Sequence, residues 1–245
     1  MQTRIDLNAD VGEGLGNEAE LMPFISSCNI ACGGHAGDIE TMTIVSRLAK
    51  KHGVKIGAHP SFPDKDHFGR KAIDMPSVAL YTSIKNQIKD LIRILEAEHL
   101  HLHHVKPHGA LYNLAAVDEK IAQVIIEVMK CLMLRVHLYV PYNSVIAKLA
   151  IENRIPIMYE AFADRNYNAD LTLVSRSDSK ALISDSDTMV DHVFNMISTE
   201  KVKTITGDFQ SIKADTFCVH GDNPEAYHLI SNLTKQLNAK GIQII

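Results

Sequence analysis

The sequence predicts the α/β class and, within it, a seven-stranded β/α barrel. Short runs of β-branched residues alternate with helical patterns, which is typical of a parallel sheet. Polar groups beside Gly or Pro follow several of these runs, and a β/α barrel builds an active site from such strand ends. No G-x-G-x-x-G follows the first strand, so a dinucleotide-binding open sheet is disfavoured.

The expected strands are short and rich in β-branched residues. In chain order they are Arg4–Asn8, Ser27–Ala31, Val54–Ala58, Leu102–Lys106, Val136–Val140, Pro156–Ala161 and Phe217–His220. Apolar residues at helical spacing predict the helices between them. These are Ile39–His52, Ser77–Glu98, Asp118–Cys131, Ser144–Glu152, Asp187–Ile197 and Pro224–Asn238.

Local signals support the ends of two helices and one hairpin. Asp38 is a good N-cap for the first of these helices, and Gly53 is a plausible stop. Asn223 is expected to cap the last helix, with Pro224 as its first residue. Thr204–Lys213 interrupts the alternation, and its central Gly-Asp pair predicts a hairpin.

Size and composition bound the classes of protein. A chain of 245 residues fits one β/α barrel, so we expect a single domain, residues 1–245. A net charge of −4 argues against nucleic acid as a partner. No apolar run is long enough for a membrane span and no signal peptide is evident, so we expect a cytoplasmic protein. The four cysteines lack C-x-x-C spacing and are expected to be buried apolar residues rather than ligands.

The first strand carries a row of polar residues. Asp6, Asn8 and Asp10 alternate, so they share one face, which makes sense near the mouth of a barrel or in a hydrogen-bonded network. Glu13 follows on a glycine-rich turn that lets backbone N–H groups approach a ligand. The alternative for Asp6 and Asn8 is a structural role in holding loops in place.

Three histidines, His35, His59 and His108, lie at or just past the ends of different strands, so they can converge on one pocket. With Asp10 they form a candidate ligand set for Zn²⁺ or a similar divalent metal. The alternative is one general base with the others donating hydrogen bonds to substrate.

Other charged groups are expected at the same mouth. Lys106 is a candidate to bind an anion, or to act as a base or nucleophile. The alternative is a structural ion pair with Glu160 or Asp10. The arginines are candidate clamps for a carboxylate or phosphate, since a guanidinium binds such groups bidentately. They are Arg70, Arg165 and Arg176.

The seventh strand ends in His220-Gly221-Asp222. Asp222 is a candidate to orient the His220 ring, as carboxylates commonly do, and the alternative is a capping role.

The ordered motifs NADVGEG, NIACGGHAGD, GAHPSFPD, VKPHGALYN, EAFADRNY and CVHGDNP resemble the LamB/YcsF family from about Ile5 to the last helix. The resemblance implies one subunit of a 5-oxoprolinase, which opens the lactam of 5-oxoproline to L-glutamate with ATP and acts with subunits B and C. It also implies an irregular, TIM-like seven-stranded barrel of the glycoside hydrolase/deacetylase type. Three residues stand where the family usually has glycine: His67, Leu171 and Lys180. If the turn near Asp170 needs a positive φ at position 171, leucine makes that conformation costly.

The resemblance and the residue chemistry together give a set of site residues, whose roles are our inference. We expect catalytic roles for Asp10, Glu13, His59, Lys106 and His108. Substrate binding is expected from Asn8, His35, Arg70, Tyr112, Glu160, Arg165, His220 and Asp222. Candidate metal ligands are Asp10, His35, His59 and His108.

ATP is the expected cofactor, with a divalent metal as a candidate. Since the chain has no G-x-x-x-x-G-K-[ST] loop, ATP is expected to bind at least partly on a partner. In the expected mechanism, Asp10 or His59 is the base toward water and His108 or Lys106 stabilises the oxyanion. Two other readings stay open: a metal-dependent amidohydrolase or deacetylase, and a non-catalytic lactam-binding subunit. The number of copies that assemble, a homo-oligomer included, is also open.

Overall fold

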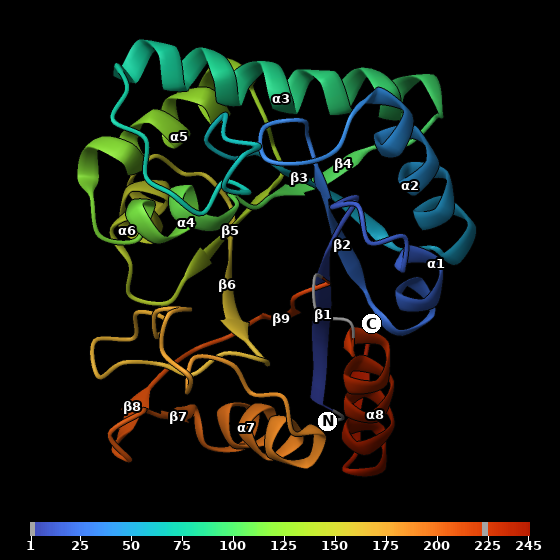
Figure 1. Cartoon of the computed structure of the whole chain (residues 1–245), viewed down its shortest axis with the longest axis vertical. Helices are drawn as coiled ribbons and strands as arrows, with labels where there is room; N and C mark the ends of the chain where they lie inside the picture. The colour runs from blue at the N-terminus through green and yellow to red at the C-terminus, as the bar shows by residue number, and fades with distance from the viewer. Residues whose placement is uncertain (1–2, 222–224) are drawn as a thin grey trace.

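The computed structural model describes residues 3–221 and 225–245. Within them, seven parallel strands close a barrel in the order β1-β2-β3-β4-β5-β6-β9, and β9 pairs back with β1 (Figure 1). An eighth strand, β10, pairs with the amino-terminal residues of β1. The bounds are β1 Thr3–Val11, β2 Ser27–Ala31, β3 Lys55–His59, β4 Leu102–Val105, β5 His137–Pro141, β6 Ile157–Phe162, β9 Thr216–Val219 and β10 Ile242–Ile244. The irregular seven-stranded β/α barrel is confirmed.

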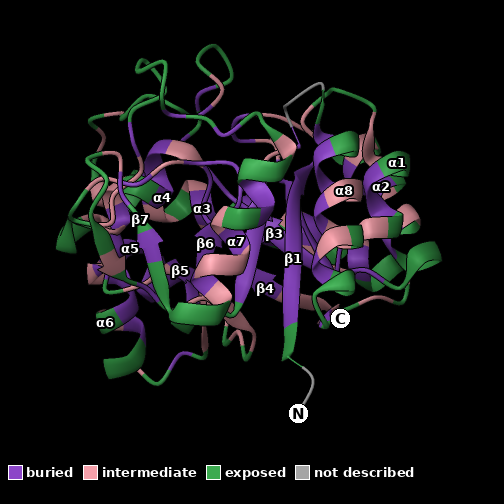
Figure 2. Ribbon diagram, turned by 90° about the horizontal axis from the view of Figure 1, so that it is seen from below, coloured by how far each residue is buried: buried purple, intermediate pink, exposed green. Residues whose placement is uncertain are grey.

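Helices surround the barrel and bury one face each against it, so the strands lie inside and the exposed residues outside (Figure 2). Side-chain caps accept a hydrogen bond from the first turn of α2, α5, α6 and α7, which explains where these helices begin. The bounds are α1 Glu18–Leu21, α2 Ile39–His52, α3 Ser77–Ala97, α4 Gly109–Ala115, α5 Glu119–Cys131, α6 Val145–Glu152, α7 Ser186–Thr199 and α8 Ala226–Ala239, with a short 3₁₀ turn at Met22–Phe24.

Most sequence-predicted elements agree with the structure to within a few residues. Asp38 caps α2, and Gly53 ends it with φ 69°. A hairpin is present as antiparallel β7 Lys201–Lys203 and β8 Phe209–Ser211, but its first strand lies before the predicted segment Thr204–Lys213. The short α1, α4 and β10 were not predicted. The expected cap at Asn223 and first helical residue Pro224 lie outside the described residues.

The barrel interior is polar where β1 crosses it. Asp6, Asn8 and Asp10 are buried and contact neighbouring strands, whereas the alternating Leu7 and Ala9 belong to the hydrophobic core. The expectation of one polar face on this strand is therefore confirmed.

Two further expectations from composition can be compared with the structure. Cys28, Cys32 and Cys218 are buried as expected, but Cys131, at the end of α5, is exposed, so that expectation was wrong there. Among the described residues, no helix is both long and apolar enough to cross a bilayer.

Candidate active site at the carboxyl end of the barrel

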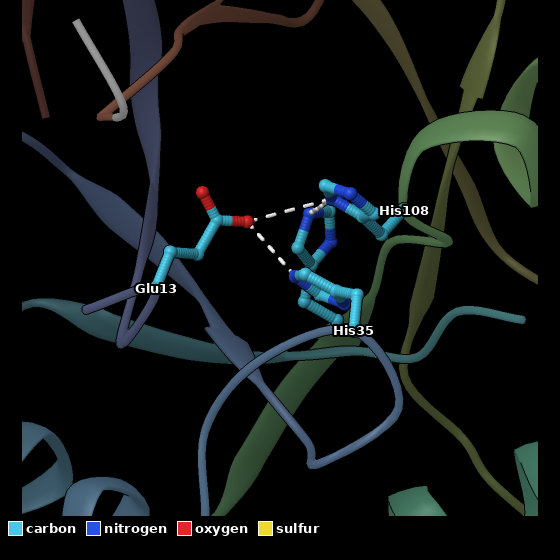
Figure 3. A group of neighbouring side chains, drawn as sticks. Glu13, His35 and His108 are labelled. Carbon is cyan, nitrogen blue, oxygen red and sulfur yellow. Dashed lines mark hydrogen bonds and ion pairs between the residues drawn. The ribbon is translucent and has the colours of Figure 1, made fainter. Parts of the chain in front are cut away.

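The first four strands each deliver one potential metal ligand to the same point. Glu13 follows β1, His35 follows β2, His59 is the last residue of β3, and His108 lies between β4 and α4. One ligand atom from each lies within 4.8 Å of all the others. Figure 3 shows the Glu13 carboxylate directed at the rings of His35 and His108. The predicted convergence of the three histidines is therefore present.

The cluster is held by short contacts. His35 Nε2 lies 2.9 Å from Glu13 Oε1, and His108 Nδ1 lies 3.4 Å from the same oxygen. The rings of His35 and His108 stack with centroids 3.6 Å apart. His59 Nε2 lies 3.0 Å from His108 Nδ1.

Hydrogen bonds to the backbone fix the tautomers of two rings. His59 donates from Nδ1 to the carbonyl of Lys106 at 2.7 Å, and His108 donates from Nε2 to the carbonyl of Phe68 at 2.9 Å. Burial and the neighbouring His35 hold the pKa of His108 well below its usual range, so this ring is neutral. In the neutral state of both rings, the two nitrogens that face each other carry lone pairs. Such a pair of acceptors is stable only with a proton or a metal cation between them.

This donor set fits a divalent cation. Tetrahedral Zn²⁺ with bonds of about 2.0–2.1 Å places its ligand atoms about 3.4 Å apart. The three contacts of 2.9, 3.0 and 3.4 Å are close to this spacing, and the other pairs lie within 4.8 Å. Backbone carbonyls orient two of the imidazoles through their other nitrogens, as is common around bound metals. The buried Nδ1 of His35 has no hydrogen-bond partner among the described residues. Burial, with a contribution from His59, lowers the pKa of His35 to about 2, so this ring is available as a neutral ligand.

The carboxylate of this cluster comes from Glu13, whereas the sequence suggested Asp10. Asp10 Oδ1 accepts from Lys106 Nζ at 2.9 Å and from Asn29 Nδ2 at 2.8 Å. Its other oxygen lies 3.4 Å from His59 Nε2, so Asp10 borders the cluster. Burial alone would raise the pKa of Asp10, but His59 and Lys106 hold it well below its usual range.

Lys106 is buried at the centre of an acidic group. Its Nζ lies 2.9 Å from Asp10, 3.0 Å from Glu160 and 3.0 Å from the Cys218 sulfur. Burial opposes the charge, yet Asp10 and these neighbours raise the pKa of Lys106 well above its usual range, so it stays cationic. Both ion pairs considered as alternatives are present, and the protonated amine is not poised as a base or nucleophile. Cys218 gave no signal in the sequence, because a lone cysteine identifies no partner.

Two asparagines connect the acidic residues. Asn8 Nδ2 donates to Glu160 Oε1 at 3.0 Å, and its own oxygen accepts from Asn29 Nδ2 at 2.7 Å. His104 Nε2 donates to Asn29 Oδ1 at 2.6 Å. Asn8 therefore organises the charged groups from beneath the mouth. Asn29, within β2, was not predicted as a site residue, although it lies in the same motif as His35.

His220 is oriented by a carboxylate from another strand end. Its Nδ1 lies 3.0 Å from both oxygens of Asp164, which also accepts from the backbone N–H of His220. Burial works against ionisation, but His220 keeps the pKa of Asp164 below its usual value. The orienting role proposed for Asp222 cannot be compared, since this residue lies outside the described ones.

A cavity of about 260 Å³ opens over these groups. Arg165 is buried in its wall and donates to the carbonyls of Val174 and Ala181, so it holds the loop after β6 against the mouth. Arg70 and Arg176 line the same cavity. Other residues of its lining are Asp10, His59, Lys106, His108, Tyr112, Phe162 and His220.

Comparison with known proteins assigns the chain to a family. Residues 5–245 match the LamB/YcsF family model. This chain belongs to the LamB/YcsF family. It is 39% identical to the A subunit of 5-oxoprolinase from Pyrococcus abyssi over 247 residues, covering 99% of this chain and 97% of the relative. Its fold matches a lactam utilization protein from Thermus thermophilus with a TM-score of 0.92, 35% identity and 99% coverage of both chains. A family 4 carbohydrate esterase from Streptomyces lividans shares the fold alone, with a TM-score of 0.51, 10% identity and coverage of 99% and 91%.

One departure from the LamB/YcsF motifs has a visible consequence. Leu171, where the family pattern suggests glycine, adopts φ 66°, the left-handed region that a branched side chain enters at a cost. Hydrogen bonds from the Leu171 N–H to Asn168 and from the Thr172 N–H to Asp170 hold the turn. The turn therefore keeps a glycine-like conformation with leucine in place.

Proposed function

We propose that this LamB/YcsF chain is the lactam-opening subunit of an ATP-dependent 5-oxoprolinase, which converts 5-oxo-L-proline to L-glutamate with release of ADP and phosphate. The cavity carries the proposal. It joins Asp10, His59 and His108 to the guanidinium groups of Arg70 and Arg176, so hydrolytic side chains lie beside groups suited to a small anion. The names of the two similar proteins support the same substrate class.

Energy input is needed to drive hydrolysis of this five-membered lactam against its equilibrium, and activation is also needed because its amide carbonyl is a poor electrophile. Phosphorylation of the amide oxygen by ATP, followed by attack of water at the ring carbon, supplies it. The sequence has no P-loop, so we place at least part of the ATP site on partner subunits, B and C of such an enzyme. Arg70 and Arg176 would hold the substrate carboxylate or the transferred phosphoryl group.

Two residues of this chain, Asp10 and His220, would carry out the proton transfers. Asp10 Oδ2, which borders both the cavity and His59, accepts a proton from the attacking water. His220, held by Asp164 through Nδ1, supplies the second proton-transfer position at Nε2. Lys106 keeps Asp10 and Glu160 ionised and in place rather than acting as a nucleophile.

Glu13, His35, His59 and His108 would hold a divalent cation. When bound, such a cation polarises a carbonyl oxygen and makes water more acidic. The same four-donor cluster favours a second candidate, a metal-dependent amidohydrolase that needs no ATP.

The two candidates are separated by measuring glutamate and ADP from 5-oxo-L-proline and ATP, with this chain alone and with co-expressed subunits B and C. The proposal expects both products in equal amounts from the complex, and none without ATP. Glutamate formed by the chain alone without ATP would favour the amidohydrolase. Failure to form glutamate with all subunits assembled would overturn the proposal.

A further inference from the structure

Besides His35 Nδ1, two buried polar atoms near the mouth lack a hydrogen bond within the described part of the chain. Glu160 Oε1 is fully used, because Lys106 Nζ and Asn8 Nδ2 each approach it to 3.0 Å. The second oxygen, Oε2, and the hydroxyl of Tyr112 have no hydrogen-bond partner among the described residues. Glu160 is 2% exposed and Tyr112 is 5% exposed. Tyr112 and Glu160 are neighbours in side-chain contact. Since buried polar groups are nearly always well paired, a ligand inserted between the two would supply the well-formed hydrogen bond that each atom lacks.

Both residues line a second cavity, of about 330 Å³. This cavity shares Tyr112, Phe162 and Leu173 with the cavity over the histidine cluster, so the two adjoin. Its wall also includes the aromatic rings of Tyr142 and Tyr167. A small ring placed there would have apolar surface against its faces and the two unpaired polar atoms at one edge.

The two atoms have opposite hydrogen-bonding character. Burial, with the charge of Glu160 and a side-chain hydrogen-bond contact to it, raises the pKa of Tyr112 well above its usual range, so the phenol keeps its proton and can donate. The free oxygen of Glu160 is an acceptor. A ligand that satisfies both must therefore present a donor and an acceptor on the same edge.

A lactam has such an edge and an open-chain amide does not. Ordinary secondary amides are trans, with N–H and C=O on opposite sides. A five-membered ring forces the cis form, which puts both groups on one side. We propose that Glu160 and Tyr112 recognise the cis-amide edge of the lactam, with Glu160 Oε2 accepting from the ring N–H and the Tyr112 hydroxyl donating to the ring carbonyl. The inference rests on the proposed function and names the residues that select its substrate class.

The inference predicts how the site discriminates among close analogues. A lactone of the same shape puts a ring oxygen where the lactam has N–H, so two acceptors would face each other at Glu160. Sites built to bond a buried donor reject analogues that lack it by large factors, and we expect at least about a 100-fold preference for lactam. L-Proline lacks the carbonyl and cannot use Tyr112.

Glu160→Gln offers a reversal of specificity. Its amide oxygen can keep the bonds from Lys106 and Asn8, which places the amide nitrogen where Oε2 now lies. The variant then offers a donor in place of an acceptor. We expect the lactam preference to fall by at least about 100-fold and the lactone to bind as well as the lactam or better.

The test is isothermal titration of the purified chain with 5-oxo-L-proline, 5-oxotetrahydrofuran-2-carboxylate and L-proline, with KM values from the assembled complex in parallel. Tyr112→Phe should weaken the lactam and the lactone alike, by about tenfold, and leave L-proline unchanged. Tyr81→Phe, on α3 away from both cavities, is the matched control and should change none of the three. Tyr112→Phe also tests the proposal if Glu160→Gln fails to fold.

The outcomes distinguish failure of the recognition proposal from failure of the proposed function. If the wild-type chain binds 5-oxo-L-proline but the folded Glu160→Gln variant keeps the wild-type lactam-to-lactone ratio, the recognition proposal is overturned while the proposed function stands. Equal effects of Tyr112→Phe on L-proline and on the lactam overturn it as well. If neither the chain nor the complex binds or turns over the lactam, the proposed function fails and takes this inference with it.

Discussion

Addition of a divalent cation should raise the thermal stability of this chain, and Glu13→Gln should remove most of that gain. The cluster offers one carboxylate oxygen and three imidazole nitrogens within 4.8 Å of one another. Glutamine keeps the size of the side chain but removes the charge. Because the cation binds the folded chain through all four groups, loss of the charged one should weaken binding by about 100-fold, the upper end of what even outer-shell changes cost.

The magnitude follows from linkage. A cation present at 100 times its Kd adds about 2.7 kcal/mol to the free energy of unfolding. For a chain of this size each kcal/mol raises Tm by about 2–4 °C, which gives about 5–10 °C. A 100-fold weaker site at the same concentration adds about 0.4 kcal/mol, or about 1–2 °C.

The assay is thermal unfolding at pH 7.5 with Zn²⁺, Mn²⁺ or Co²⁺ after treatment with a chelator. Glu20→Gln, on the exposed face of α1, is the matched control and should keep the full gain. The reasoning is refuted if none of the three cations shifts the Tm of the wild type, or if Glu13→Gln shows the same gain.

Four further results are expected. Lys106→Met leaves two buried carboxylates without their cation and should destabilise the fold by about 3–5 kcal/mol, measured by urea unfolding. Burial lowers the pKa of His192 to about 4 from an ordinary 6.5. As pH falls, the unfolded chain therefore binds this proton before the folded chain does. The free energy of unfolding should fall by about 1.4 kcal/mol per pH unit between pH 6.5 and pH 4. His192→Gln should reduce this loss when unfolding is measured across that range. Gly57→Ala puts a Cβ into the His104 ring and should cost about 1–3 kcal/mol by the same urea assay. Arg165→Lys replaces the two nitrogens that reach the carbonyls of Ala181 and Val174 with a single Nζ, so hydrogen exchange should show lost protection in residues 171–183 with a global cost of about 1–2 kcal/mol.

The strands and helices were predictable because their signals are local. Ser27–Ala31 and Ile39–His52 have the same bounds in the sequence prediction and in the structure. β10, at Ile242–Ile244, was missed because three residues carry too little pattern, and it forms by pairing with the edge of β1. The turn of helix α4 was missed because KPHGALY reads first as a strand end.

The positions of the site residues were predictable, but their partners were not. Parallel strands end at one side of a barrel, so three histidines at strand ends must approach one another. Which carboxylate joins them depends on how the turn after β1 folds, and the structure brings Glu13 to the cluster while Lys106 binds Asp10. Such choices depend on packing between residues far apart in the chain.

The most direct test of the central claim is glutamate release by a complex of subunits B and C with either wild-type chain or His59→Ala, after size-exclusion chromatography shows equal assembly. His101→Ala, an exposed histidine, is the matched control. The account predicts that His59→Ala lowers glutamate formation from 5-oxo-L-proline by about 100-fold, while His101→Ala changes nothing. His59 borders the proposed base Asp10 at 3.4 Å and would help to hold the cation, and loss of such supporting groups costs up to about 100-fold in activity. A wild-type rate from the assembled His59→Ala complex would show that the lactam is opened elsewhere and would contradict the account.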